Sequence, residues 1–210
     1  GAYLALAGKK TLLVDFDSQG NMTSGVGADR EKPTVYDLLA GTAPASSVIR
    51  KSAIPGLSVI PASIDLSGAA IELVDQEKRE YFLKGALEPL KADFDFILID
   101  CPPSLGILTL NGLVAADEVL IPLQCEYFAL EGLTLLLQTV KRVQKTLNPE
   151  LDIGGIFFTM YDSRTRLAQD VVQQVTSYFK DRVFRTIIPR NVRLSEAPSH
   201  GLPICKYDAL

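Results

Sequence analysis

Residues 94 to 113, FDFILIDCPPSLGILTLNGL, contain a short apolar strand, an acid, two prolines and then a helical pattern. Four consecutive apolar residues run directly into Asp100, which is typical of a strand buried on both faces of a sheet. Pro102 and Pro103 end the strand and stiffen the loop that follows. The apolar spacing then predicts a helix over residues 105–115. A strand, a loop and a helix in this order favour a parallel α/β sheet.

The same alternation of strand and helix extends along the chain. Strands are expected at residues 11–16, 57–61, 94–99, 118–123, 153–159 and 183–188. Helices are expected at residues 1–7, 64–74, 78–90, 105–115, 129–147 and 167–179. Residues 20–56 are richer in Gly, Pro, Ser and Thr, which predicts a mobile excursion with short helices. Residues 1–210 are therefore expected to form a single α/β domain, with a mostly parallel sheet covered by helices on both faces.

Bulk composition indicates a folded protein that does not cross a membrane. The 210 residues are 47% hydrophobic and 22% charged, which is enough apolar surface for a buried core. No apolar run approaches the roughly 20 residues that span a bilayer, and no secretory leader opens the chain, so a cytoplasmic location is expected. Three scattered cysteines and one histidine argue against a disulfide framework, a zinc site or a histidine-based triad.

The charge distribution leaves a nucleic-acid partner open. The net charge is −4, but residues 164–193 hold seven Lys or Arg and two acids. Such a basic region can meet phosphate backbones, and it can equally be a solvated face with ordinary ion pairs.

Asp15 and Asp17 follow an apolar strand in the stretch LLVDFD, residues 12 to 17. Ligands of parallel α/β sheets bind beyond the carboxyl ends of the strands. Side chains two residues apart on a strand point the same way, so these carboxylates would repel and favour a cation or proton between them. A strand that merely ends in an Asp- and Ser-rich turn is the alternative, but the cost of burying two acids favours a functional site.

Asp100 ends its strand in the way a Walker B acid does. In that motif the carboxylate holds Mg²⁺, usually through a water, beside the β- and γ-phosphates of a nucleotide. A loop in this position, Cys101 to Ser104, can act as a switch that senses hydrolysis. The alternative is an acid that caps the next helix. We interpret Cys101 as a small space-filling residue, and Ser104 lacks the partner base of a nucleophile.

Taken together, five stretches resemble the ParA/Soj branch of the deviant-Walker P-loop ATPases. They are LLVDFDSQGNMTSGVG (12–27), FDFILIDCPPSLGILTLNGL (94–113), VLIPLQCEYFALEGL (119–133), GIFFTMYDSRTRL (155–167) and IIPRNVRLSEAPSHGLPICKYD (187–208). They cover nearly the whole chain in the family's order. The last stretch is the most specific, and it is more similar to chromosomal Soj than to plasmid ParA or MinD.

The resemblance implies a role for each matching residue. Asp17 matches the acid that positions the attacking water, Asp15 lies close to the magnesium shell, and Asp100 matches the Walker B acid. The switch residues would be Cys101, Pro102, Pro103 and Ser104. The nucleotide-binding residues would be Met160, Pro189, Arg190, Asn191 and Glu126. The DNA-binding residues would be Arg164, Arg190 and Arg193.

The resemblance also implies a cycle with ATP and Mg²⁺ as cofactors. ATP would close a homodimer, the dimer would bind DNA of the nucleoid without reading its sequence, and a ParB-type centromere-binding partner would stimulate hydrolysis. No membrane contact is expected. Phosphate-backbone binding would make the affinity for DNA fall steeply with salt.

One part of the family pattern is missing from the sequence. The glycine-rich loop K-G-G-x-G-K-[ST], whose backbone N–H groups and lysine cradle the phosphates, does not occur in residues 1–210. The closing helix of the family is not recognisable either. The chain is therefore expected to be incomplete at both ends and inactive in hydrolysis by itself. The family's first strand lies in the middle of the sheet, so its loss would expose unpaired backbone groups and lower solubility.

Three alternatives remain at this point. A phosphatase of the haloacid-dehalogenase type also begins with Asp-x-Asp after a strand, but its downstream lysine and acidic cluster are not evident. A non-catalytic module that binds DNA and a partner would explain the missing loop. A MinD-like ATPase that cycles on membranes would need a basic amphipathic helix at the C-terminus, and residues 190–201 favour the DNA-acting branch instead.

Overall fold

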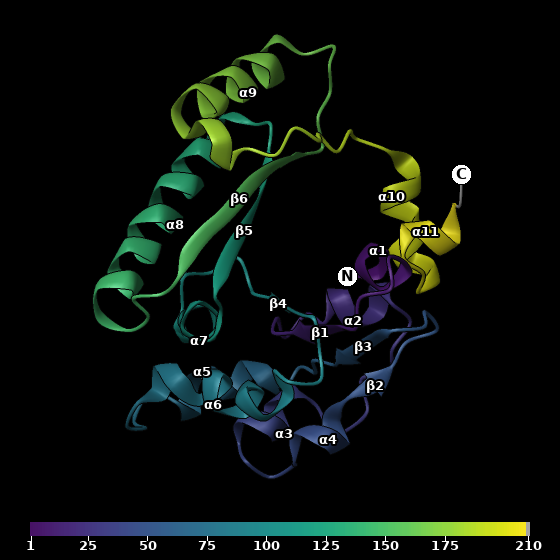
Figure 1. The fold of residues 1–210 in the computed structure, drawn as a ribbon, viewed down its shortest axis with the longest axis vertical. Helices are drawn as coiled ribbons and strands as arrows, with labels where there is room; N and C mark the ends of the chain where they lie inside the picture. Colours follow the sequence, from purple (N-terminus) through teal and green to yellow (C-terminus); the bar gives the residue numbers. More distant parts are fainter. Residues whose placement is uncertain (209–210) are drawn as a thin grey trace. The chain divides into compact units, whose positions relative to one another are not determined.

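The computed structural model describes residues 1–208 and divides the chain into two compact units (Figure 1). One unit comprises Gly1–Ala115 and the segment from Arg193 onward, and the other comprises Ala116–Val192. The predicted single domain over residues 1–210 stays a prediction, and its residues 209 and 210 lie outside the described part of the chain.

The first unit is built on a four-stranded sheet in the order β2-β3-β1-β4. Its strands are β1 (Thr11–Asp15), β2 (Arg50–Lys51), β3 (Leu57–Ile60) and β4 (Phe96–Asp100). Strand β1 is parallel to both β3 and β4, and only the short β2 pairs antiparallel. The sheet is therefore mostly parallel, and its central strand is β1.

Helices cover both faces of this sheet because β1 is apolar on both faces. Leu12, Val14 and Phe16 pack into a core with residues from α3 (Val35–Leu39), α5 (Leu66–Glu72), α6 (Phe82–Leu87) and α7 (Ile107–Ala115). Leu13 points to the other face, where it packs with residues of α1 (Ala2–Leu6) and α2 (Asn21–Gly25). Every residue of β1 is buried. The predicted fold class, an α/β sheet with helices on both faces, is confirmed.

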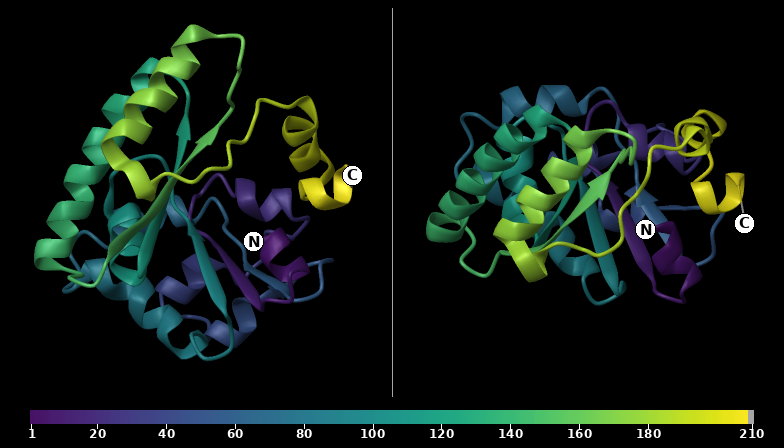
Figure 2. Two further views of the ribbon diagram at one scale, coloured as in Figure 1. Left: turned by 45° about the horizontal axis from the view of Figure 1, so that its top comes forward. Right: turned by 90° about the horizontal axis from the view of Figure 1, so that it is seen from above.

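The C-terminal segment of the first unit packs against α2, as Figure 2 shows in yellow and purple. It contains α10 (Val192–Glu196), the 3-10 turn η4 (Ala197–His200) and α11 (Ile204–Tyr207). The backbones meet at two glycines, since a Cβ on Gly27 would lie 2.7 Å from the carbonyl oxygen of Gly201. Gly27 and Gly201 also have φ of 69° and 63°, which glycine adopts without strain. The rest of this unit includes α4 (Ala45–Val48) and the 3-10 turns η1 (Arg79–Tyr81) and η2 (Glu88–Leu90).

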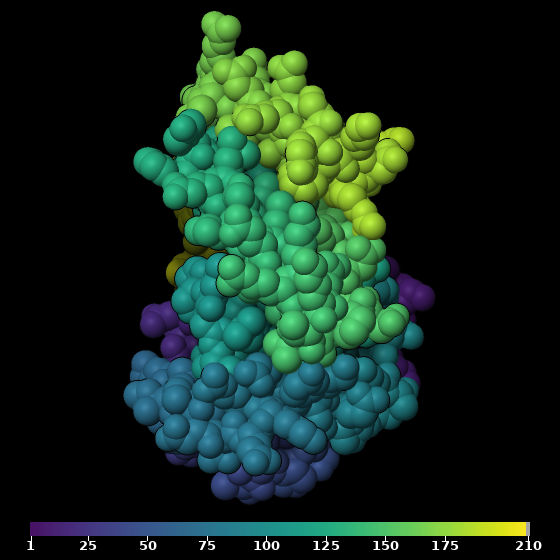
Figure 3. Space-filling view, turned by 90° about the vertical axis from the view of Figure 1, so that its left-hand side faces the viewer, coloured from purple at the N-terminus to yellow at the C-terminus, as the bar shows by residue number. Residues whose placement is uncertain are grey.

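The second unit is a parallel strand pair covered by two helices. Strands β5 (Glu118–Gln124) and β6 (Asp152–Thr159) pair over their whole length, with one irregularity beside Val119 and Leu120. Helices α8 (Tyr127–Thr146) and α9 (Arg166–Phe179) pack on them, followed by the 3-10 turn η3 (Lys180–Arg182). Figure 3 looks onto the outer surface of α8 and α9. The sequence pattern predicts the order of these two strands and two helices.

One predicted strand is wrong. Residues 183–188 form no strand, and only isolated bridges join Val183 to Ile156 and Pro189 to Tyr161. Two backbone hydrogen bonds link the segment to β6, from Phe184 to Ile156 and from Ile188 to Phe158. The ring of Phe184 packs over Gly155, where a Cβ would lie 2.4 Å from a ring carbon. A regular ladder is therefore interrupted, although the segment does run beside β6.

Candidate functional site

Asp15 and Asp100 lie side by side at the carboxyl edge of the first unit's sheet. They are register partners in the parallel pair of β1 and β4. The Phe16 N–H donates to the carbonyl oxygen of Asp100 at 2.8 Å, so the pairing continues one residue past β1. Because both strands are parallel and end at the same level, the sequence predicts this convergence, and the structure brings the two acids together.

Asp15 is fully buried and its carboxylate is held by protein donors. One oxygen, Oδ2, accepts from the Thr23 N–H at 2.7 Å and from the Thr23 hydroxyl at 2.6 Å. The other, Oδ1, accepts from the Asp17 N–H at 3.3 Å. Burying a carboxylate is costly without such partners, so these contacts explain how Asp15 is tolerated at this position. Its predicted place in a magnesium shell stays a prediction.

Asp17 is only partly buried and lies in a tight turn just beyond β1. Its Oδ1 accepts from the Gln19 N–H at 3.0 Å, and its carbonyl oxygen accepts from the Gly20 N–H at 2.9 Å. Gly20 has a φ of 62°, which suits glycine. The turn leaves the Asp17 carboxylate partly exposed just beyond the carboxyl end of β1, where a ligand could reach it.

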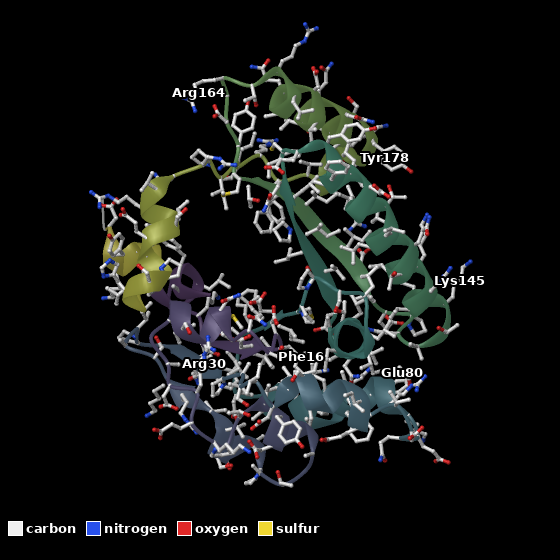
Figure 4. The ribbon with its side chains drawn as sticks, turned by 180° about the vertical axis from the view of Figure 1, so that it is seen from behind. Phe16, Arg30, Glu80, Lys145, Arg164 and Tyr178 are labelled. Atoms are coloured by element: carbon white, nitrogen blue, oxygen red, sulfur yellow. The ribbon has the colours of Figure 1, made fainter. Side chains whose placement is uncertain are left out.

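The side chain of Arg30 binds to the same turn (Figure 4). Its Nη2 donates to the Gly20 carbonyl oxygen and to the Ser24 hydroxyl, both at 2.7 Å. A Cβ on Gly20 would lie 2.8 Å from the guanidinium carbon of Arg30, so the glycine also leaves room for this contact. The sequence analysis did not identify Arg30.

The protonation of Asp100 is affected by its surroundings at this edge. Partial burial of its carboxyl group, followed by the negative charges of Asp15 and Asp17, raises its pKa to about 6. Asp15 and Asp17 therefore lie close enough for their charges to act on Asp100. A divalent cation next to Asp100 would relieve this repulsion.

The donor set fits Mg²⁺ held by few protein ligands. Among residues 1–208, no group of three or more His, Cys, Asp or Glu side chains is arranged to hold a metal ion. Mg²⁺ in nucleotide sites is commonly held by one or two carboxylates, waters and the phosphates themselves, so a dedicated protein cage is not required. Asp100, with its crowded and solvent-accessible carboxyl, is the residue that best fits this use.

The predicted switch, Cys101 to Ser104, is tied to the helix that follows it. The Thr109 hydroxyl in α7 lies 3.2 Å from the Pro102 carbonyl oxygen and 2.5 Å from the Ser104 carbonyl oxygen. Its single proton can serve one of these oxygens at a time. The loop is therefore held in a compact form by a residue that the sequence analysis did not identify.

Cys101 packs into α7, in agreement with its interpretation as a space-filling residue. A Cβ on Gly112 would lie 2.4 Å from the Cys101 sulfur. Burial, and next the charge of Asp100, raises the pKa of the thiol to about 12. A protonated, buried thiol is a poor nucleophile, so its contribution here is packing.

The predicted nucleotide-binding residues of the second unit gather around the end of β6. Met160 follows β6 with a φ of 54°, which is strained for a side chain of its size. Next to it, Tyr161 exchanges backbone hydrogen bonds with Ile188 and Arg190, at 3.2 and 3.0 Å. Pro189 and Asn191 flank Arg190 in the same segment. The Arg190 guanidinium reaches Glu126 at 3.8 Å, so the structure brings these two predicted residues together.

The arginines predicted to bind DNA all have acidic neighbours. Arg164 forms a bidentate salt bridge with Asp162, with Nε–Oδ1 at 2.9 Å and Nη2–Oδ2 at 2.6 Å. These hydrogen bonds hold the pKa of Asp162 well below its usual range. Arg193, in the first unit, reaches Glu196 at 3.2 Å and Asp208 at 3.9 Å. The role of each arginine in binding DNA stays a prediction.

Among residues 1–208 no helix is both long and apolar enough to pass through a membrane.

Known proteins match this chain over almost its whole length. Residues 1–153 match the family described as "AAA domain". The chromosome-partitioning ATPase Soj of Treponema pallidum is 74% identical over 209 residues, which cover 100% of this chain and 82% of that protein. The sporulation initiation inhibitor protein Soj of Bacillus subtilis is 55% identical over 99% of this chain and 83% of its own length.

Solved structures agree with these sequence matches. A protein described as cobyrinic acid a,c-diamide synthase from Mycobacterium smegmatis, solved with ADP and magnesium, has a TM-score of 0.84 and 42% identity. The match covers 96% of this chain and 82% of that one. Apo McdA of Cyanothece, at 23% identity and a TM-score of 0.89, shows the same fold.

High identity over the whole chain, together with the matched domain, assigns the protein to a family. The residues of the acidic edge lie within the matched region. The chain belongs to the Soj/ParA family of chromosome-partitioning ATPases, whose fold is that of the P-loop NTPases.

Proposed function

We propose that this protein works in chromosome partitioning as an ATP-dependent switch that dimerises with ATP and binds DNA without reading its sequence. A ParB-type partner would stimulate hydrolysis and release the protein from DNA. The observation that carries the proposal is the convergence of Asp15, Asp17 and Asp100 at one edge of a buried parallel sheet. The carboxyl edge of a parallel sheet is where ligands of such folds bind, so acids at this edge support the management of a metal-bound phosphate.

Each acid has a separate task in this proposal. Asp100 would hold Mg²⁺, directly or through water, and the cation would offset the effects of burial and of the neighbouring acids that raise the pKa of Asp100. When bound, Mg²⁺ would neutralise negative charge on the phosphates. Asp17, which is partly exposed and oriented by the Gln19 N–H, would position the attacking water. Asp15, which is buried, would support Asp17 from behind.

The sequence limits what residues 1–210 can do by themselves. They contain no K-G-G-x-G-K-[ST] loop, so the backbone cradle for the phosphates is missing from this stretch. We therefore propose that this chain alone binds ATP weakly and does not hydrolyse it.

Hydrolysis assays on the protein in its natural length, beside the 210-residue chain, test the proposal. Asp17→Asn should lower the ATP hydrolysis rate on the order of 100-fold while ATP binding is retained, because only water positioning is lost. Asp100→Asn should weaken the Mg²⁺ dependence of binding as well. Asp93→Asn, an exposed acid before β4, is the control and should hydrolyse ATP normally. Hydrolysis at the wild-type rate in Asp17→Asn would contradict the catalytic assignment, and no hydrolysis by the natural-length protein would favour the binding module.

A further inference from the structure

The buried carboxylate of Asp15 is the centre of a hydrogen-bond network that joins three segments of the first unit. Its Oδ1 takes the Asp17 N–H, and its Oδ2 takes both donors of Thr23 in α2. The Thr23 hydroxyl in turn accepts from the Ala62 N–H at 3.1 Å, in the loop after β3. The end of β1, helix α2 and the loop after β3 are therefore joined through the side chains of Asp15 and Thr23.

Thr23 is fully buried, and its hydroxyl is used both as donor and as acceptor. The short contact to Asp15, 2.6 Å, is that of a hydroxyl on a charged acceptor. Among the described residues no buried side-chain polar atom lacks a partner, so this network is complete. Removal of the Thr23 hydroxyl would leave Asp15 Oδ2 with the Thr23 N–H as its one remaining donor there, and it would leave the Ala62 N–H without this acceptor in a dry environment.

The network bears directly on Asp17. Asp15 cannot hold the Asp17 backbone unless its own carboxylate is fixed, and Thr23 supplies both hydrogen bonds to Oδ2. Asp17 itself is only partly buried and depends on the turn for its orientation. The buried Asp15 carboxylate therefore helps to fix the position of the Asp17 carboxylate, through its hydrogen bond with the Asp17 N–H.

We propose that Thr23 is a positioning residue for hydrolysis, which acts through Asp15 to fix the Asp17 carboxylate. This inference rests on the proposed role of Asp17 and adds a residue that neither the motif nor the family match assigns. Asp15 in this arrangement is also a positioning residue rather than a direct metal ligand. A displacement of about 1 Å at a catalytic group can cost on the order of 100-fold in rate, so a hydroxyl without contact to the nucleotide can control turnover.

The test compares three threonine variants of the natural-length protein. Thr23→Val keeps the shape and removes the hydroxyl, and it should lower kcat about tenfold or more while the KM for ATP changes less than about threefold. Thr23→Ser keeps the hydroxyl and should restore kcat to within about threefold of wild type. Thr11→Val is the matched control. Thr11 is also fully buried, and its hydroxyl donates to the Lys9 carbonyl oxygen at the opposite end of β1. It should leave kcat unchanged.

Amide hydrogen exchange on the same variants gives a second result that does not depend on hydrolysis. Thr23→Val should speed exchange of the Asp17 and Ala62 amides about tenfold or more, while exchange in α7 stays at the wild-type rate. Thr23→Ser and Thr11→Val should leave the Asp17 amide unchanged.

The outcomes separate this inference from the proposed function. An unchanged Asp17 amide in Thr23→Val, or equal losses of kcat in Thr23→Val and Thr11→Val, would overturn the positioning role. If the wild-type protein does not hydrolyse ATP, the proposed function fails, and the exchange data still decide whether Thr23 holds Asp17. A loss of kcat in Thr23→Ser as large as in Thr23→Val would also contradict a role of the Thr23 hydroxyl in positioning Asp17.

Discussion

The carboxyl group of Asp100 lies where three acids share one edge of a sheet, and its protonation responds to that crowding. Its pKa is raised from 3.8 to about 6, first by burial and then by Asp15 and Asp17. The folded state therefore takes up a proton at higher pH than the unfolded chain does. The resulting stability is complete near and below 3.8 and is lost as the pH rises through about 6.

Asp100→Asn should remove this pH dependence. At neutral pH the variant should be more stable to unfolding than wild type by about 1 kcal/mol, since solvent screening reduces the effect at an accessible carboxyl. At acidic pH, where Asp100 is protonated, the two should be equally stable. Urea denaturation across the pH range, without nucleotide or Mg²⁺, measures the difference. Asp93→Asn is the control and should follow the wild-type curve. A variant less stable than wild type at neutral pH would contradict the crowding of charge at this edge.

At the residue scale, the sequence predicted the acids and missed the groups that hold them. Asp15, Asp17 and Asp100 are recognisable because each follows an apolar strand, and strand ends of a parallel sheet converge. Thr23, Arg30 and Thr109 act through contacts that only the folded chain creates. Thr23, for example, lies eight residues after Asp15 and reaches Ala62, which lies 39 residues further on. A hydroxyl in a Ser- and Thr-rich stretch gives no signal of such a partner.

At the scale of elements, α7 fits closely against the end of β4. Gly112 faces the Cys101 sulfur, and a Cβ at that position would lie 2.4 Å from it. The contact joins the helix to the loop that follows Asp100. The packing of these elements therefore depends on one glycine and one thiol.

Gly112→Ala should destabilise the protein by about 1–3 kcal/mol, because the new methyl group collides with the thiol. Cys101→Ala combined with Gly112→Ala should recover most of this loss, because the colliding sulfur is removed. Gly85→Ala in α6 is the matched control. No atom lies within 4 Å of its added Cβ, so helix propensity should make it neutral or slightly stabilising. Thermal denaturation of wild type, Cys101→Ala, Gly112→Ala, the double variant and Gly85→Ala measures the coupling, and purely additive losses at positions 101 and 112 would refute the contact.

The turn after α9 carries strain that a glycine should relieve. Lys180 has φ 47° and ψ −114°, a region that side chains rarely adopt, and its side chain is exposed. Lys180→Gly should therefore stabilise the fold by about 1 kcal/mol. Lys141→Gly, in the middle of α8, is the opposite control and should cost about 1 kcal/mol through lost helix propensity. Chemical denaturation measures the free energy of unfolding of both variants. A Lys180→Gly variant less stable than wild type would contradict the strained geometry.

The sequence predicts strands well where apolar runs are continuous, and less well where tertiary contacts determine whether a strand forms. Strands β1, β4, β5 and β6 lie within about two residues of their predicted positions because their apolar runs are continuous. The segment 183–188 has the apolar character of a strand, but its polar Arg185 and Thr186 and the Phe184–Gly155 contact interrupt the ladder. The two-residue β2 is too short for any periodicity to indicate.

At the scale of the whole molecule, charge is unevenly distributed along the chain. Residues 164–193 carry a net charge of +5, so the remaining residues carry −9. An acidic protein is repelled by DNA at long range, so the proposed binding to DNA would have to depend on a few local cations. Arg164 is the best placed of these, since its side chain is 86% exposed and projects from the loop after β6 (Figure 4).

The pair with Asp162 leaves Arg164 able to contact a phosphate. A guanidinium has five N–H donors, and the Asp162 carboxylate occupies Nε and one donor of Nη2. The Arg164 hydrogen bonds lower the pKa of Asp162, so its carboxylate stays charged at neutral pH and well into the acid range. The carboxylate therefore orients the guanidinium and leaves its Nη1 donors uncommitted to this pair.

Arg164→Ala should weaken binding to DNA of any sequence and lower the slope of log K against log salt by about 1, since one phosphate contact is lost. Hydrolysis of ATP without DNA should not change, because the substitution lies outside the acidic edge. Lys91→Ala is the control. Lys91 is also exposed and ion-paired, at 3.0 Å from Glu88, but it lies far along the chain from the basic region. Filter binding to two unrelated duplexes over a range of salt measures the slopes, and equal slopes for Arg164→Ala and Lys91→Ala would exclude Arg164 from the DNA contact.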